Sequence, residues 1–89
     1  MIKQTITIVN KLGLHARAAS KLVNCASQYE SDVSIGRNGN QVNAKSIMGV
    51  MMLAASKGVE LELEIDGSDE EACSQALVEL ISSRFGEDE

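Results

Sequence analysis

His15, the single histidine of the chain, is the residue best suited to covalent chemistry. It lies between Gly13 and Arg17, where a strand pattern has ended and a helix pattern begins. An imidazole is a nucleophile near neutral pH and can carry a transferred group as a covalent intermediate. Because the first N–H groups of a helix lack partners within it, they attract anions. This position therefore predicts a phosphate site.

Arg17 supports the same interpretation, since its planar guanidinium is permanently charged and matches the oxygens of a phosphate. The alternative is that His15 is a surface or core residue without chemistry, which is common for a lone histidine. On the residues alone both interpretations stay open. The glycine before His15 and the arginine after it shift the balance toward a phosphate site.

Alternating polar and apolar residues predict four strands that could position this site. The strand patterns cover residues 2–8, 33–35, 42–44 and 59–66. The pair Asn38-Gly39 is typical of a two-residue hairpin and predicts that the second and third strands pair with each other. In the last pattern, acidic residues alternate with valine, leucine and isoleucine. One face of the sheet is therefore expected to meet water.

Three helix patterns complete the order. The first begins at Ala16, the second begins after Ser46 as N-cap and covers residues 47–53, and the third follows a capping box of Ser68 and Glu71 and ends before Gly86. Because such strands need cover on one side only, we expect an α+β fold in a single domain, residues 1–89. It should be a two-layer, open-faced sandwich with three helices on one face of a four-stranded, mainly antiparallel sheet (β-α-β-β-α-β-α).

Composition argues against several classes of function. No apolar run approaches the roughly 20 residues of a membrane span and no signal peptide is evident, so we expect a cytoplasmic protein without membrane insertion. A net charge of −5 with one tyrosine and one phenylalanine argues against nucleic-acid binding. Cys25 and Cys73 are expected to be buried free thiols, and no metal site or cofactor is predicted.

The charges are distributed unevenly along the chain. Residues 1–59 carry seven basic and two acidic side chains (+5), whereas residues 60–89 carry one basic and eleven acidic side chains (−10). A basic region around His15 can attract phosphorylated ligands or an acidic partner. The simpler explanation for most of the acids is that they form the solvated faces of one strand and one helix.

The predicted helix after Ser46 has more apolar surface than one narrow face can hide. If Val50 and Leu53 face the sheet, other apolar side chains point elsewhere and could form an adaptable docking patch, the alternative being a fully buried helix. The side chains expected in this patch are Ile47, Met48 and Met51. A phosphate on Ser46 would suit the helix start and disturb a docked partner, but an N-cap serine is also explained by structure alone.

Two motifs together resemble HPr, the histidine-containing phosphocarrier family of the bacterial phosphotransferase system. They are Gly13-Leu-His15-Ala-Arg17-Ala-Ala-Ser20 and Ala44-Lys-Ser46-Ile-Met-Gly-Val50-Met-Met-Leu-Ala54. The resemblance covers essentially the whole chain. It implies a carrier rather than an enzyme, which takes a phosphoryl group from phosphoenolpyruvate through enzyme I and passes it to an EIIA component. The group would be carried on the Nδ1 atom of His15.

The resemblance also implies roles for other residues. Arg17 would assist the exchange, and the N–H groups of Ala16 and Arg17 would hold the phosphate oxygens. Ser46 matches a serine that HPr kinase/phosphorylase modifies in bacteria that possess this enzyme. The residues implied in docking enzyme I and EIIA are Ile47, Met48, Met51 and Ser20.

Ala18 departs from the family pattern, which usually has proline directly after the arginine. Proline is favoured in a first helical turn, but alanine is a good helix former, so we expect a slightly looser helix start with phosphotransfer retained. The competing interpretations are a partner-binding regulatory module that transfers no phosphate and a nitrogen-branch relative of HPr. The run 45–50 favours the sugar-branch or regulatory form, and an acylphosphatase-like enzyme is disfavoured because no second catalytic arginine or asparagine is evident.

Overall fold

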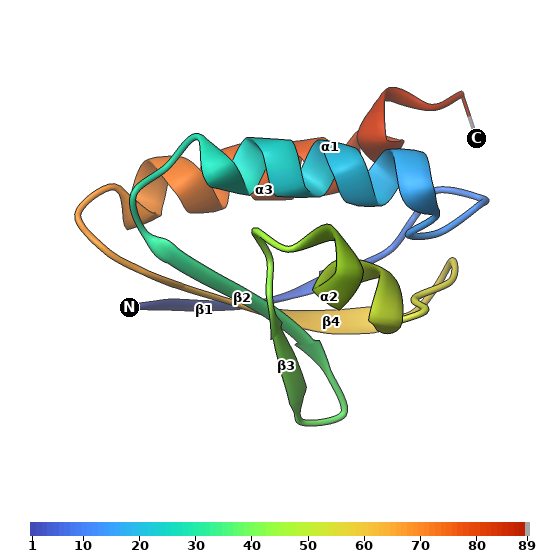
Figure 1. The fold of residues 1–89 in the computed structure, drawn as a ribbon. Coiled ribbons are helices and arrows are strands. Elements are labelled where there is room, and N and C mark those ends of the chain that lie inside the picture. Colours follow the sequence, from blue (N-terminus) through green and yellow to red (C-terminus); the bar gives the residue numbers. More distant parts are fainter. Residues whose placement is uncertain (89) are drawn as a thin grey trace.

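The computed structural model describes residues 1–88, which fold as an antiparallel sheet covered on one face by helices (Figure 1). The elements are β1 (Ile2–Thr7), α1 (Ala16–Ser27), β2 (Asp32–Arg37), β3 (Asn40–Asn43), α2 (Ile47–Met52), β4 (Glu60–Asp66) and α3 (Glu70–Ser82), followed by the short turn η1 (Arg84–Gly86). This order confirms the predicted α+β sandwich. The first helix contacts both of the others, so the three form one layer.

Within the described residues the strands lie in the order β1-β4-β2-β3, and each neighbouring pair is antiparallel. The central position of β4 follows from its sequence, because its inward residues Leu61, Leu63 and Ile65 are fully buried. The hairpin between β2 and β3 turns at Asn38 and Gly39, whose φ angles of 54° and 85° are both left-handed. The predicted Asn-Gly turn is therefore confirmed.

The inner face of α1 carries mostly short apolar side chains, which let the helix lie close to the sheet. Ala18, Ala19, Leu22 and Ala26 are all fully buried beneath it. Ala18 lies in the first turn, before the first hydrogen bond of the helix, which Ala19 N–H donates to the His15 carbonyl at 2.8 Å. The helix therefore starts with regular geometry without proline in its first turn.

The predicted capping box at the start of α3 is wrong. Asp69 is the N-cap residue, and its carboxylate does not cap α3 but accepts hydrogen bonds from the Ser31 hydroxyl and from the N–H groups of Glu30 (2.9 Å) and Ser31 (3.0 Å). These bonds, that of the Ser31 hydroxyl first, lower the pKa of Asp69 below its ordinary value. The carboxylate of Asp69 thus bonds to the segment before β2, and the predicted capping contact between Ser68 and Glu71 is not formed. Ser68 is exposed.

Both cysteines are free thiols that pack in the helical layer. Cys73 is fully buried, and burial raises its pKa to about 11, whereas Cys25 is only partly buried and has its pKa raised for the same reason. The expectation of two buried thiols thus holds fully for Cys73 only. Between residues 1 and 88, no helix has the length and apolar character needed to cross a membrane.

Candidate functional site

His15 is the N-cap residue of α1. Its backbone is extended (φ −72°, ψ 176°), and its side chain makes no capping hydrogen bond. The N–H groups of Ala16, Arg17 and Ala18 precede the first bond of the helix and have no acceptor within it. The imidazole is partly open to solvent, with 28% of its side-chain surface exposed. The structure thus brings a reachable imidazole and unpaired helix donors to the same place.

The loop before His15 is held by the segment that follows α2. Leu14 N–H donates to the Ala55 carbonyl at 2.8 Å, and Leu14 itself is buried. Gly13 has a left-handed φ of 69°, and a Cβ at this position would lie only 2.5 Å from the Ala55 oxygen. Glycine is therefore needed both for the backbone angle and for the close approach. This packing fixes the position of the backbone that leads to His15.

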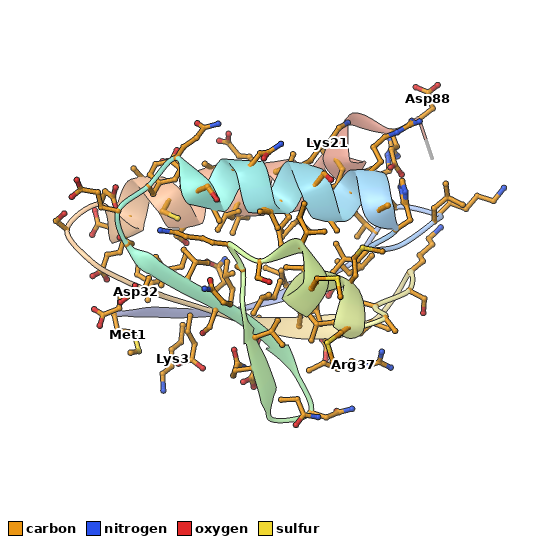
Figure 2. All side chains as sticks on the ribbon, viewed as in Figure 1. Met1, Lys3, Lys21, Asp32, Arg37 and Asp88 are labelled. Carbon is orange, nitrogen blue, oxygen red and sulfur yellow. The ribbon has the colours of Figure 1, made fainter. Side chains whose placement is uncertain are left out.

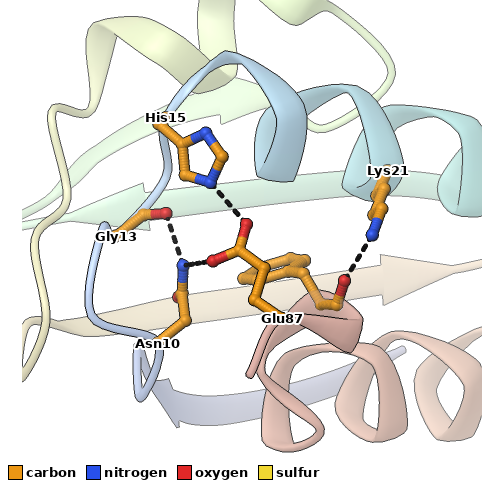
Figure 3. Close-up of polar contacts among 6 residues, drawn as sticks. Asn10, Gly13, His15, Lys21 and Glu87 are labelled. Atoms are coloured by element: carbon orange, nitrogen blue, oxygen red, sulfur yellow. Dashed lines mark hydrogen bonds and ion pairs between the residues drawn. The ribbon is translucent and has the colours of Figure 1, made fainter. Parts of the chain in front are cut away.

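Asn10 is fully buried beneath the same loop and ties two chain segments together. Its Nδ2 donates to the Gly13 carbonyl at 2.8 Å and to Glu87 Oε1 at 3.0 Å (Figure 3). Because both neighbours can only accept, the atom between them must be the amide nitrogen. Asn10 Oδ1 has no hydrogen-bond partner among the described residues. Both N–H donors of the Asn10 amide thus hold residues next to His15 in place.

Glu87 reaches the imidazole from the other end of the chain. Its Oε2 lies 2.5 Å from Nε2 of His15, and its side chain is 13% exposed (Figure 3). The hydrogen bond to His15, followed by that to Asn10, lowers the pKa of Glu87 below its ordinary value. The Nδ1 atom is on the side of the ring turned away from Glu87 and has no hydrogen-bond partner within residues 1–88.

No sequence pattern singled out Glu87 from the acidic residues near the end of the chain. The 72 positions that separate it from His15 leave no local pattern to detect. The available signal was general: the single histidine lies in the basic segment 1–59, and the segment 60–89 is acidic. That signal suggests an attraction between the two segments, but it does not select one acid from eleven.

The turn that carries Glu87 is anchored to the body of the protein. Phe85 is fully buried, and its carbonyl accepts a hydrogen bond from Lys21 Nζ of α1 at 2.6 Å. In Figure 2, Lys21 lies on the upper, helical side of the molecule, below the turn that leads to Asp88, whereas Met1 and Asp32 lie at the left end. Arg84 and Phe85 both have left-handed φ angles (59° and 56°), which cost on the order of 1–3 kcal/mol each. Burial of the Phe85 ring contributes about 1.5–3 kcal/mol against this strain.

Arg17 is exposed in the first turn of α1, two residues beyond His15. In the described part of the chain its guanidinium has no hydrogen bond or ion pair, so its donors are available for an anion. Ala16 is exposed beside it, and Ser20 is partly buried one turn further along. The residues predicted around the phosphate therefore lie together at one helix end.

The predicted orientation of α2 is confirmed. Val50 is fully buried and Leu53 nearly so, whereas Met48 is 74% exposed and Ile47 and Met51 are 42% exposed. Four further large apolar residues are exposed as well, and none of them belongs to the predicted patch: Met1, Val9, Leu12 and Met52. Periodicity identified the buried side of this helix correctly but underestimated the exposed apolar surface.

Ser46 is the N-cap of α2, as predicted, and is partly buried. Its hydroxyl accepts a hydrogen bond from Gly49 N–H at 3.2 Å. At the other end of the helix, Arg37 Nη1 donates to the carbonyls of Leu53 (3.2 Å) and Ala54 (3.3 Å). Both ends of this six-residue helix are therefore satisfied by side chains.

Comparison with known proteins gives consistent matches. Residues 2–83 match the family described as "PTS HPr component phosphorylation site". The "Phosphocarrier protein HPr" of Neisseria meningitidis serogroup A is 56% identical over 89 residues and covers 100% of both chains, and that of Pseudomonas aeruginosa is 56% identical over 85 residues and covers 94% of each. The solved structure of HPr-C-His from Thermoanaerobacter tengcongensis is 47% identical, covers 100% of both chains and superposes with a TM-score of 0.96.

Proposed function

This chain belongs to the HPr family of phosphocarrier proteins of the phosphotransferase system, and we propose that His15 is the residue that carries the phosphoryl group. The protein is a carrier in a relay and not an enzyme. The observation that supports His15 most strongly is its position at the start of α1, where its Nδ1 is turned away from Glu87 and the first N–H groups have no acceptor within the helix.

The proposed reaction is an in-line displacement at phosphorus. The lone pair of Nδ1 attacks the phosphoryl group of the donor, the N–P bond forms, and the bond between phosphorus and the donor breaks with its electron pair. The phosphate oxygens would lie against the N–H groups of Ala16 and Arg17, where the helix dipole favours negative charge. The Arg17 guanidinium would neutralise charge on the same oxygens.

Histidine suits a carrier because its phosphoramidate keeps a high transfer potential, whereas a serine ester would hold the group too firmly. The donor must approach the same nitrogen that the acceptor later approaches, so the imidazole has to be reachable. The partial exposure of His15 meets this requirement. We propose phosphoenolpyruvate, acting through enzyme I, as the donor and an EIIA component as the acceptor.

The exposed apolar residues of α2 are the proposed docking surface for these partners. Burying flexible methionine side chains such as Met48 against a partner is favourable and adapts to more than one surface. The proposed docking residues are Ile47, Met48 and Met51, together with Ser20. Phosphorylation of Ser46 by HPr kinase/phosphorylase would place about two negative charges beside this surface and weaken docking of an acidic partner.

A labelling experiment tests the proposal. The protein is incubated with labelled phosphoenolpyruvate, magnesium and enzyme I, and one acid-labile, alkali-stable phosphate per chain is expected. His15→Ala should abolish the label, whereas Ser46→Ala should retain it. A wild-type protein that stays unlabelled, or a His15→Ala variant that is labelled equally, would contradict the proposal.

A further inference from the structure

The two oxygens of the Glu87 carboxylate have separate partners on the two segments that flank the site loop. Oε1 accepts from Asn10 Nδ2 at 3.0 Å, and Oε2 lies 2.5 Å from His15 Nε2 (Figure 3). The Asn10 amide also holds the Gly13 carbonyl, two residues before the histidine. The carboxylate and the backbone that leads to His15 are therefore fixed to the same buried side chain.

The chemistry of this contact determines where the imidazole proton lies. An ionised carboxylate has no proton to donate, so a bond at this distance requires that Nε2 be the donor. A neutral imidazole has only one ring proton, and placing it on Nε2 leaves the lone pair on Nδ1. The Glu87 carboxyl is ionised at neutral pH, as a glutamate ordinarily is, and the bonds from His15 and Asn10 lower its pKa further.

The position of Glu87 is itself enforced from outside the site. The buried Phe85 ring and the bond from Lys21 Nζ to the Phe85 carbonyl hold the turn that precedes it. Glu87 N–H donates to the Arg84 carbonyl at 2.9 Å, which closes this turn directly before the carboxylate. Such a braced side chain can orient an imidazole more precisely than a freely rotating one, because less rotamer freedom is lost when the bond forms.

From these contacts we propose that Glu87 is a positioning residue for phosphoryl transfer. By holding Nε2–H, it keeps the Nδ1 lone pair turned toward the incoming group. This inference deepens the proposed function and rests on His15 being the residue that carries the phosphoryl group. Glu87 does not touch the phosphoryl group, because the ring lies between the carboxylate and Nδ1.

The proton balance of the transfer follows from this arrangement. When Nδ1 forms its bond to phosphorus and the donor leaves with its electron pair, the Nε2 proton stays on the ring, which becomes cationic. The adjacent Glu87 carboxylate neutralises that charge. On transfer to the acceptor the N–P bond breaks, its electron pair returns to Nδ1, and the ring is again neutral with its proton on Nε2. The same tautomer is thus ready for the next cycle.

The decisive variant is Glu87→Gln, which keeps the length of the side chain but removes its charge. Asp88→Asn is the matched control, since it removes one negative charge from the next residue, which is exposed. The ¹⁵N chemical shifts of the His15 ring report which nitrogen carries the proton, and they are recorded at about pH 9, where an ordinary imidazole is neutral. We expect Nε2–H as the single tautomer in the wild type and in Asp88→Asn. In Glu87→Gln we expect averaged shifts from both tautomers.

The same three proteins are then compared as phosphoryl acceptors of enzyme I. Glu87→Gln should lower the maximal transfer rate about tenfold with little change in KM, an effect at the low end for a hydrogen-bonding partner that orients an imidazole. Asp88→Asn should transfer at the wild-type rate. Circular dichroism of each variant verifies that the fold is retained.

Each result decides a different question. If Glu87→Gln keeps the wild-type tautomer and rate, or if Asp88→Asn slows transfer equally, the role given to Glu87 is overturned. If the wild type is not phosphorylated at all, the proposed function fails. In that case the ring shifts still decide whether Glu87 sets the tautomer, because they require no partner protein.

Discussion

The starts of α1 and α2 have similar backbone shapes but differ in how their first N–H groups are satisfied. Both N-cap residues are extended, with φ and ψ of −72° and 176° at His15 and −116° and 118° at Ser46. At α2, the Ser46 hydroxyl accepts the bond from Gly49 N–H, whereas at α1 the imidazole makes no such bond. One helix start is closed by its own cap, and the other is left open.

The difference reflects how each helix is stabilised. A good N-cap side chain contributes about 1 kcal/mol, which matters most for a short helix such as α2 with six residues. The twelve-residue α1 has five buried side chains on its inner face and can do without this contribution. Packing, rather than capping, holds the helix whose first N–H groups we propose to bind the phosphate. An open helix start is thus a feature that the core of the protein makes possible.

The most severe test of this comparison is to give α1 the cap of α2. His15→Ser should abolish phosphoryl transfer from enzyme I, because a serine hydroxyl without an adjacent general base is a weak nucleophile. It should also be more stable than His15→Ala by about 1 kcal/mol, since the hydroxyl can accept from the open N–H groups. Labelling and urea unfolding of the two variants measure both effects. Equal stability of the two variants would show that α1 is not open to capping.

The next largest effect is expected at the loop that positions the open start. Gly13→Ala should destabilise the protein by about 2–3 kcal/mol, because the new Cβ meets the Ala55 carbonyl and the backbone is left-handed. Gly39→Ala is the matched control: its φ of 85° is also left-handed, but no atom lies within 4 Å of the new Cβ. It should cost only about 1 kcal/mol. Similar unfolding free energies for the two variants would refute the role of the close approach.

At the closed start, removal of the cap should affect stability and not transfer. Ser46→Ala should lose about 1 kcal/mol of unfolding free energy, since the Gly49 N–H loses its acceptor. Labelling of His15 should continue. Unchanged stability would contradict the capping role of Ser46, and loss of labelling would contradict its independence from phosphoryl transfer.

The start of α3 adds a pH-dependent case, because its N-cap carboxylate bonds to another segment. Hydrogen bonds from Ser31 and Glu30 lower the folded-state pKa of Asp69, so its contribution to stability is complete above the unfolded pKa and is lost as pH falls through the folded one. The urea concentration at the unfolding midpoint should therefore decrease as the pH is lowered below about 4. The fall should be smaller in Asp69→Asn than in Asp88→Asn, the exposed control. Identical pH profiles would contradict the assignment.

The smallest effect is expected at Ala18, the departure from the family pattern. The Ala18 N–H precedes the first bond of α1, so Ala18→Pro removes no hydrogen bond from the helix. Transfer should be retained and stability should change by less than about 1 kcal/mol. Loss of labelling in a folded Ala18→Pro variant would show that the geometry of the site is misassigned.

Local pattern predicted the fold well, and it predicted His15 at the start of a helix, where the structure has it. The alternation in β4, the Asn38-Gly39 hairpin and the buried side of α2 follow from residue spacing, and each is present in the structure. The failures have a common cause. Glu87 on His15 and Asp69 on Ser31 are contacts between segments 72 and 38 positions apart, and no periodicity describes such contacts.

The most direct test of the central claim is a pair of NMR spectra, recorded before and after phosphorylation by enzyme I and phosphoenolpyruvate. Coupling between ³¹P and ¹⁵N identifies the bonded ring nitrogen, and amide shifts identify the N–H groups that meet the phosphate. We predict a bond to Nδ1 of His15, with large amide shifts at Ala16 and Arg17 and none at Gly49. A phosphate on Nε2, or unchanged amides at the start of α1, would contradict the account.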